Sequence, residues 1–305
     1  IAFGTPAPDE EPVDDAEVLN QKWGVKPGDL WVAGEHRIAC GDCTSADVVE
    51  RVMDGGKADL CVTSPPYAVG KEYEVGVTIE EHFALLRAVA DRMIETTVVG
   101  GFIFVNFDEI APQSHAGPLT GSKRACIYPI SKDYWGIFHD ERGCDLYCYR
   151  IWYKPFNRLQ KPFWSYKTSI AHHQEWEHIW TWRTPGGTGD EPHDFDVSVH
   201  AVWDTRNEDT DDKPLSRHVA AYPVCLPDRA IRAHSDKGDV ILDPFLGSGT
   251  TIVACERLER KGRGIDIEPK YVAVTLERLA NLGLTPERQN GNTGHGKPKK
   301  SRRKG

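Results

Sequence analysis

The sequence has 305 residues, of which 39% are hydrophobic and 27% charged, values ordinary for a water-soluble globular chain of one or two domains. No apolar run approaches the ~18–20 residues of a membrane-spanning helix, and eight cysteines are too sparse for a disulfide scaffold, which indicates reduced thiols. The net charge of −9 excludes a uniformly basic nucleic-acid binder, although charge can still be concentrated locally.

The N-terminal segment, residues 1–22, is expected to form an acidic, disordered lead. Its first 20 residues hold six acids and neither Lys nor Arg, a composition that also does not fit a secretory signal peptide. Ile1 is not an initiator Met, so we expect a fragment or a processed chain, with an additional domain missing from either end. The folded domain is placed at 23–285.

The first half of this domain is predicted to alternate strands and helices. In chain order, the predicted elements are strands in DLWVAG and HRIACGD, a helix near 45–54, a strand at 58–63, a helix at 79–96 and a strand at 102–107. The 79–96 helix has a strong start signal, because Thr78 and Glu81 form a capping box before it. The 58–63 strand must end at Pro65, since two consecutive prolines lack backbone N–H groups.

The middle of the chain, about 108–205, has weak periodicity and reads as an insert with short strands in LYCYRIWYK and EHIWTW. Regular order resumes at Pro227. The predicted elements there are a helix in LPDRAIRAHS, a strand in GDVILD, a helix in GTTIVACERLER, a strand in GRGIDI and a helix in PKYVAVTLERLANL. This alternation predicts an α/β fold with a mostly parallel sheet covered on both faces. Residues 286–305 are expected to form a basic, disordered tail.

A glycine-rich turn, PFLGSGTT, joins a strand to a helix and can present free N–H groups to a ligand. No Lys follows Gly249, which excludes a Walker phosphate loop, and Ile252 stands where a dinucleotide fingerprint needs glycine. A nucleoside without a diphosphate remains, with Asp243 accepting from an ammonium or bound water and Asp266 accepting from both ribose hydroxyls. Taken alone, a structural turn explains GSG nearly as well.

Asp42, in HRIACGDC, ends a strand where its carboxylate can accept from an adenine amino group while the Cys43 backbone meets the ring edge. An N-cap for the following helix explains Asp42 at least as well.

The stretch TSPPY combines stiff prolines with one hydroxyl and one aromatic ring. The prolines fix the Ser64 hydroxyl and the Pro65 carbonyl as acceptors, and an exocyclic NH₂ offers two matching hydrogens. Drawing those hydrogens away localises the nitrogen lone pair and makes the amine nucleophilic, while Tyr67 can stack on the base. The alternative is a strand-ending Pro-Pro turn with an incidental Tyr.

Together, these motifs resemble the S-adenosylmethionine-dependent DNA amino-methyltransferases of the permuted β class. In that class a [DNST]PP[YFW] motif precedes the FxGxG cofactor motif, with the target-recognition region between them. The correspondence runs from about Asp29 to Leu282 through HRIACGD, ADLCVTSPPY, GGFIFVNF, RIWYKP, EWEHIWTW, HVAAYPVCLPDRAI, DVILDPFLGSGTT and GIDIEPKYVAVTLERL. The resemblance implies a seven-stranded mixed sheet with helices on both faces.

The resemblance also implies the site residues. The catalytic set, which receives a flipped base, is Ser64, Pro65, Pro66 and Tyr67. The set expected to bind S-adenosyl-L-methionine is Asp42, Cys43, Tyr222, Pro223, Asp243, Phe245, Gly247, Ser248, Gly249, Thr250 and Asp266. Within it, Asp266 would hold the ribose and Asp42 the adenine.

The expected reaction is direct, in-line methylation of a base amine. C5-cytosine methylation needs a Cys nucleophile, typically after a proline, and none of the eight cysteines follows one. Many adenine enzymes have DPPY where this chain has SPPY, and the Ser form is mostly associated with cytosine N4, so N4-methylcytosine is the predicted product. N6-adenine methylation, or a cofactor-binding but inactive DNA-binding module, are the alternatives.

Double-stranded DNA is the expected partner. Residues 150–167 hold five basic residues and no acid, interleaved with aromatic rings; the predicted phosphate contacts are Lys154, Arg158, Lys161 and Lys167. A solvated loop over aromatic strands explains that run about equally well. No metal site is expected, because the cysteine pairs lack a clear second ligand pair.

By analogy with the class, the expected assembly is a homodimer that serves restriction–modification or epigenetic marking. The expected location is the cytoplasm, on the nucleoid, for a bacterial or phage protein, and the nucleus for a eukaryotic one. The basic tail is equally compatible with non-specific DNA binding, a nuclear address or a linker.

Overall fold

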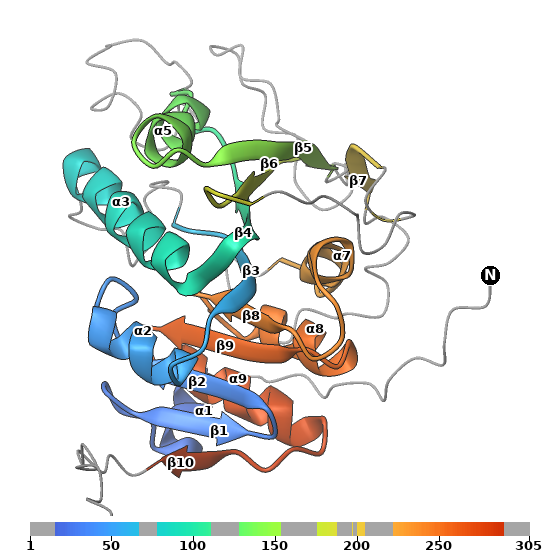
Figure 1. Ribbon diagram of the computed structural model, residues 1–305. Helices are drawn as coiled ribbons and strands as arrows, with labels where there is room; N and C mark the ends of the chain where they lie inside the picture. Colours follow the sequence, from blue (N-terminus) through green and yellow to red (C-terminus); the bar gives the residue numbers. More distant parts are fainter. Residues whose placement is uncertain are drawn as a thin grey trace, which may run out of the picture.

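The computed structural model describes residues 16–66, 78–110, 128–153, 176–187, 197, 200–204 and 222–289. Within them, one sheet has the strand order β10-β1-β2-β9-β8-β3-β4-β6-β5-β7, with helices packed against it (Figure 1). The predicted α/β class is therefore confirmed. The expected number of seven strands was wrong, since the sheet has ten strands. Strands of the insert extend one edge and a short C-terminal strand extends the other.

The helices of the described residues are α1 (Ala16–Trp23), α2 (Ala46–Met53), α3 (Ile79–Thr96), α5 (Ser131–Trp135), the π-helix η2 (Gly136–Asp140), α7 (Cys225–His234), α8 (Thr250–Arg257) and α9 (Pro269–Asn281). The strands are β1 (Leu30–Ala33), β2 (His36–Cys40), β3 (Ala58–Thr63), β4 (Thr97–Phe107), β5 (Asp145–Tyr153), β6 (Trp176–Arg183), β7 (Val202–Asp204), β8 (Val240–Asp243), β9 (Lys261–Asp266) and β10 (Glu287–Gln289). No helix among these is long and apolar enough to cross a membrane.

Five neighbouring strands in the middle of the sheet, β2, β9, β8, β3 and β4, are parallel. The chain leaves β3 toward β4 but leaves β8 toward β9, so its direction across the sheet reverses between β3 and β8. In open α/β sheets, ligands bind outside the carboxyl ends of the strands at such a switch point. A ligand-binding site is therefore expected at the loops that follow β3 and β8.

Alternate residues of the central strands pack on opposite faces, as strands with helices on both sides require. Cys61 of β3 lies in a core cluster with residues of α2 and α3, whereas its neighbours Leu60 and Val62 pack with residues of α7 and α8. A third cluster joins Ile38 of β2 to α9. The parallel strands are thus held in place by apolar packing on both faces of the sheet.

Local signals explain the element boundaries. Helix α3 begins where predicted, because the Thr78 hydroxyl accepts from the Glu81 N–H at 3.2 Å and the Glu81 carboxylate accepts from the Thr78 N–H at 2.8 Å. Strand β3 ends at Thr63, directly before Ser64 and the two prolines. The bounds predicted for this helix and for this strand are confirmed.

The predicted disordered ends were partly wrong. Residues 16–22 belong to α1, because Leu19 and Trp23 pack against the cluster on α9 and Glu277 of that helix accepts from both Lys22 and Trp23. Residues 287–289, assigned to the tail, form β10 and pair with β1. Residues 1–15 and 290–305 lie outside the described residues.

Candidate active site

Motifs that are far apart in the sequence meet at the carboxyl end of the parallel strands. Cys40 at the end of β2 pairs with Asp266 at the end of β9, and the Gly41 N–H donates to the Asp266 carbonyl at 2.9 Å. Thr63 at the end of β3 donates from its hydroxyl to the Asp243 carboxylate at the end of β8, at 3.0 Å. The structure therefore brings the SPPY, GSG and Asp42 segments to one edge of the sheet.

The glycine-rich turn after β8 depends on two glycines with positive φ, 55° at Gly247 and 84° at Gly249. A Cβ at Gly249 would lie 2.5 Å from the Thr275 hydroxyl oxygen of α9, so this glycine is needed for close packing. A Cβ at Gly247 would meet nothing within 4 Å. The turn is thus closed toward α9 and open at Gly247, where a ligand can approach the backbone.

Asp266 is anchored by backbone N–H groups on both oxygens. Gly247 donates to Oδ2 at 2.7 Å and Glu268 donates to Oδ1 at 2.8 Å. Burial raises the pKa of this carboxyl to about 7, although the two N–H donors act in the opposite direction. Each oxygen keeps a second lone pair, so the carboxylate can still accept from a pair of ribose hydroxyls.

Asp243 has no exposed surface and already accepts from four protein donors. The Thr63 hydroxyl and the Phe245 N–H, both at 3.0 Å, reach Oδ1, while the hydroxyls of Thr251 at 2.5 Å and Tyr222 at 3.3 Å reach Oδ2. Burial raises its pKa to about 6. A direct contact with a bound ammonium, as predicted, would have to displace one of these donors.

Tyr222 completes a hydroxyl chain with the first turn of α8, since its hydroxyl lies 2.8 Å from that of Thr251. Burial, followed by the nearby Asp243 carboxylate, raises the pKa of Tyr222 well above its ordinary value, so the phenol stays protonated. Pro223 follows directly and precedes α7. The structure thus places Tyr222 and Pro223 next to the glycine-rich turn and the first turn of α8.

Arg278 of α9, which is 3% exposed, contacts both Ser248 and Thr250 from the α9 side of the turn. Its guanidinium donates to the Ser248 carbonyl at 3.0 Å and to the Thr250 hydroxyl at 3.1 Å. The Thr250 hydroxyl is therefore engaged on the α9 side of the turn. Sequence reasoning missed Arg278, whose position in an amphipathic helix gives no sign that it is buried.

Asp42 is exposed, and its Oδ1 accepts from the backbone and the hydroxyl of Thr44 at 2.8 and 2.7 Å. The N-cap of α2 is Ser45, so the interpretation of Asp42 as that N-cap was wrong. Cys43 is 7% exposed, and burial raises the pKa of its thiol to about 12, which keeps it neutral. An exposed carboxylate beside a buried, neutral side chain is compatible with an adenine site.

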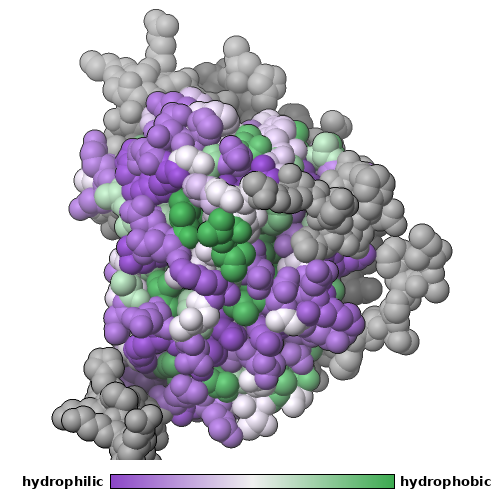
Figure 2. Space-filling model, viewed as in Figure 1, coloured by the Kyte–Doolittle hydropathy of each residue, from purple (hydrophilic) through white to green (hydrophobic). Residues whose placement is uncertain are grey.

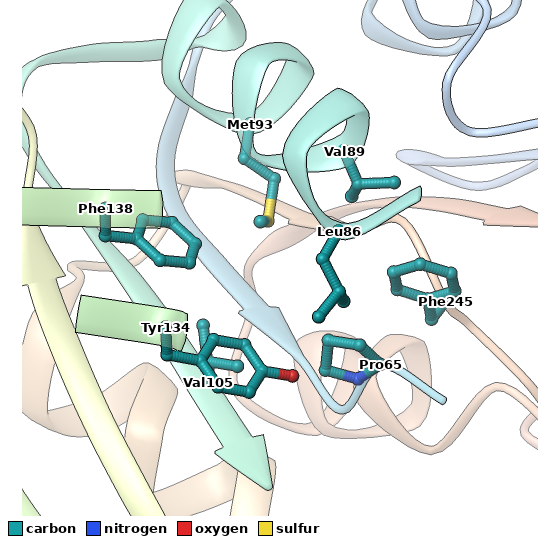
Figure 3. A pocket seen from close by; sticks show the side chains of 8 residues that line it. All are labelled: Pro65, Leu86, Val89, Met93, Val105, Tyr134, Phe138 and Phe245. Carbon is teal, nitrogen blue, oxygen red and sulfur yellow. The ribbon is translucent and has the colours of Figure 1, made fainter. Parts of the chain in front are cut away.

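Pro65 of the SPP segment and Phe245 of the glycine-rich turn line one small apolar cavity. In Figure 3, Pro65 and Phe245 lie on the same side of this cavity next to Leu86 of α3, and the Tyr134 hydroxyl of α5 points toward Pro65 from the side where Val105 of β4 lies. Apolar side chains also gather near the centre of the face where Figure 1 draws β3 and β4 (Figure 2). The two predicted motifs therefore adjoin in space.

Several predicted residues lie outside the described part of the chain: Tyr67, Lys154, Arg158, Lys161 and Lys167. Ser64 and Pro66 are half-buried and Pro65 is buried. Among the described residues, no group of three or more His, Cys, Asp or Glu side chains could hold a metal ion. Sequence reasoning also missed Thr63 and Thr251, although a hydroxyl directly before SPP and another after GSG were visible signals.

Comparisons with known proteins identify relatives of this chain. The curated relatives include the Type II methyltransferase M.BglI of Bacillus subtilis, 28% identical over 75% of this chain and 82% of that protein. Another is the Type II methyltransferase M.ScaI of Streptomyces caespitosus, 27% identical over 72% of this chain and 74% of that protein.

Two solved structures share the fold. A Thermus thermophilus protein described as a DNA modification methylase, complexed with S-adenosyl-L-methionine, has a TM-score of 0.58 at 25% identity and covers 81% of this chain and 94% of its own. The PvuII DNA methyltransferase, described as cytosine-N4-specific, has a TM-score of 0.62 at 20% identity and covers 91% and 90%. Residues 58–277 match the N6/N4 DNA methylase family, and this chain belongs to that family.

Proposed function

We propose that this protein methylates the exocyclic N4 amine of a cytosine flipped out of double-stranded DNA. As a DNA methylase of the N6/N4 family it uses S-adenosyl-L-methionine, which supplies an electrophilic methyl group on a sulfonium. One observation carries the proposal: Ser64 and Pro65 directly follow β3 at the switch point, where Thr63 is hydrogen-bonded to the strand that leads into the glycine-rich turn.

The cofactor is bound by groups at the strand ends. Asp266 accepts from the ribose hydroxyls, Asp42 accepts from the adenine amine with Cys43 beside the ring, and Gly247 allows the backbone to approach the methionine part. These roles fit the open space at Gly247 and the lone pairs left on the Asp266 carboxylate.

The Ser64 hydroxyl and the Pro65 carbonyl accept the two hydrogens of the base amine. These hydrogen bonds strengthen as the nitrogen becomes pyramidal, so they stabilise the transition state more than the ground state. Flipping the base costs a few kcal/mol, which stacking on Tyr67 and the pocket hydrogen bonds offset. Holding the nitrogen in line with the methyl group supplies much of the remaining acceleration. The nitrogen would gain the methyl group as the bond from methyl to sulfur breaks, the sulfonium would leave as a neutral thioether, and the nitrogen would release one proton to solvent.

The choice of cytosine over adenine rests on Ser64, because the SPPY form of the motif is mostly associated with N4-cytosine enzymes. N6-adenine methylation is the alternative within the same family. Incubation with labelled S-adenosyl-L-methionine and unmethylated genomic DNA, followed by digestion to nucleosides and mass spectrometry, is expected to give N4-methylcytosine. N6-methyladenine would overturn the base assignment, and cofactor binding without any transfer would identify an inactive DNA-binding module.

DNA docking is proposed to use the basic and aromatic run at 150–167, with phosphate contacts from Lys154, Arg158, Lys161 and Lys167. Replacing one phosphate-contacting lysine by alanine is expected to flatten the plot of log affinity against log salt by about one unit. An unchanged slope for a given variant removes that residue from the DNA contact surface.

A further inference from the structure

Asp243 joins three segments of the chain that are distant in sequence. Its carboxylate accepts from Thr63 at the end of β3, from Tyr222 before α7, and from Phe245 and Thr251 around the glycine-rich turn. The side chain has no exposed surface. With two donors on each oxygen, the carboxylate is fixed in one orientation and in turn fixes the groups around it.

The hydrogen bond between Thr63 and Asp243 lies beyond the backbone ladder that connects their strands. The pairing of β3 with β8 comprises Leu60 with Ile241 and Cys61 with Leu242, and it stops before Thr63. On its other side Thr63 still pairs with Val105 of β4. At the strand tips, therefore, a side-chain hydrogen bond of 3.0 Å continues the connection between β3 and β8 where the ladder ends.

The two ends of this connection are the two halves of the reaction centre. Thr63 is covalently followed by Ser64, whereas the Asp243 carboxylate receives the N–H of Phe245, two residues before Gly247. We propose that Thr63 and Asp243 are positioning residues that hold the Ser64–Pro65 corner at a fixed distance from the glycine-rich turn during methyl transfer. This inference rests on the proposed role of Ser64, but it does not depend on which base is methylated.

A positioning role is distinguishable from a purely stabilising one. Misplacing reacting groups by about 1 Å can lower a rate on the order of 100-fold while leaving substrate binding intact. If Thr63 aligns the corner, its loss must lower turnover at saturation, because the cofactor groups on β9 and on the turn keep their own anchors. A merely structural loss would lower thermal stability and reduce activity only through unfolding.

The experiment compares Thr63→Val, Thr63→Ser and the control Thr97→Val. Thr97 is also a buried threonine, 5% exposed, whose hydroxyl donates to the Met93 carbonyl at 2.7 Å. It pairs with Ala58, at the opposite end of β3 from Ser64, and its hydroxyl also lies 3.2 Å from the Cys61 thiol. Its replacement therefore removes buried hydroxyl contacts that involve neither the Ser64 corner nor the glycine-rich turn. Turnover is measured at saturating cofactor and DNA, cofactor affinity by calorimetry and melting temperature by scanning fluorimetry.

Thr63→Val is expected to lower turnover by at least about tenfold and to change the dissociation constant of S-adenosyl-L-methionine by less than about twofold. Thr63→Ser, which restores the hydroxyl, is expected to recover most of the rate. Thr97→Val should lose a similar amount of thermal stability without losing turnover. Wild-type turnover in Thr63→Val, an equal rate loss in Thr97→Val, or no recovery in Thr63→Ser would each overturn the inference.

The turnover assay counts labelled methyl groups on DNA whichever base carries them. The role of Thr63 is therefore tested independently of the proposed cytosine specificity. An active wild type whose product is N6-methyladenine contradicts the cytosine assignment and leaves the role of Thr63 to be judged by its own variants. A wild type that binds cofactor but transfers no methyl group removes both the proposed function and the positioning role.

Discussion

The five parallel strands and the antiparallel edge formed by β6 and β5 belong to one sheet but use their side chains differently. The parallel strands carry acids at their ends, with Asp243 and Asp266 hydrogen-bonded by surrounding backbone and hydroxyl groups. The antiparallel edge carries large aromatic side chains. Polar groups therefore gather at the carboxyl ends of the parallel strands, whereas the described strands of the insert are packed through aromatic side chains.

The packing at the antiparallel edge centres on Trp182 of β6, which has no exposed surface. Its ring stacks on Phe138 of η2 with centroids 5.2 Å apart and meets Trp180 edge-on at 5.5 Å. Close by, His178 stacks on Phe107 at 5.1 Å and lies 3.3 Å from the Glu109 carboxylate. The His178–Phe107 contact attaches the insert to β4, the other contacts lie within the insert, and none of them involves a residue of the glycine-rich turn.

The largest expected effect is a loss of stability on removing the Trp182 ring. Trp182→Ala is expected to lower the free energy of unfolding by about 3–5 kcal/mol, because it leaves a large cavity between β6 and η2. Below the melting transition, cofactor affinity should stay near the wild-type value. Chemical denaturation and calorimetry measure the two quantities. Trp135→Ala is the control, since that ring is 39% exposed and its loss should cost much less. Loss of cofactor binding by the folded variant would show that the two regions are coupled.

At the end of the parallel strand β3, Ser64→Ala is expected to lower the rate of methyl transfer and not the stability of the protein. Removing one acceptor from the base amine should lower turnover on the order of 100-fold, with the cofactor dissociation constant nearly unchanged. Single-turnover kinetics with labelled cofactor measure the first quantity and calorimetry the second. Unchanged turnover together with weakened cofactor binding would assign Ser64 to the cofactor site and contradict its proposed role.

A pH dependence of cofactor binding should come next in size. In the free protein burial raises the pKa of Asp266 to about 7, and the ionised form is the better acceptor for ribose hydroxyls. The dissociation constant should therefore rise as the pH falls below 7, by up to about tenfold per pH unit. Asp266→Asn should bind weakly at pH 8 and show a flatter profile.

The contribution of Asp266 to the stability of the protein without cofactor depends on pH in the opposite direction to its contribution to cofactor binding. Because the folded-state pKa of Asp266 lies above the value of an unfolded chain, its contribution to folding is complete below pH about 4 and is lost as the pH rises through about 7. Melting temperatures of the wild type and Asp266→Asn, recorded without cofactor from pH 4 to 8, test this. A wild-type curve parallel to that of the variant would contradict the raised pKa.

The difference between the parallel strands and the antiparallel edge also explains how much could be predicted from the sequence. In the parallel region, local signals fix the elements: the capping box before α3 and the apolar run that ends at Pro65 gave the bounds of α3 and β3. The motifs at the strand ends were identified from their residue types and from their order along the chain, which resembles that of the DNA amino-methyltransferases. The Thr63–Asp243 bond and the buried Arg278 were missed, because each depends on a partner far away in the sequence.

Outside the parallel strands, prediction was weaker for physical reasons. The insert strands β5 and β6 were recognised from their aromatic runs, but the three-residue β7 is too short to show any periodicity. Helix α1 was mistaken for part of a disordered lead, because its composition is polar and its apolar contacts are made with α9. Tertiary packing, which no local pattern reveals, decides both cases.

The smallest expected effect concerns the attachment of α1 to the parallel region. Glu277 of α9 accepts from Lys22 at 2.7 Å and from the Trp23 indole N–H at 2.8 Å. Burial acts to raise its pKa, but the hydrogen bonds from α1 outweigh this and lower it, so the stabilisation is present near neutral pH and lost as the pH falls below about 4.5.

Glu277→Gln keeps an acceptor for Trp23 and removes the ion pair with Lys22, whose side chain is 57% exposed. We expect a loss of about 0.5–1 kcal/mol in urea denaturation at pH 7, a smaller loss at pH 3, and full cofactor affinity. Lys237→Met, at an exposed ion pair with Glu259 away from α1, is the matched control and should change stability by less. Equal effects of the two variants would mean that the Lys22–Glu277 ion pair contributes no more to the domain than an exposed ion pair does. A larger effect at Glu277 would instead show that the parallel strands are stabilised by the N-terminal helix, as the insert is by its aromatic side chains.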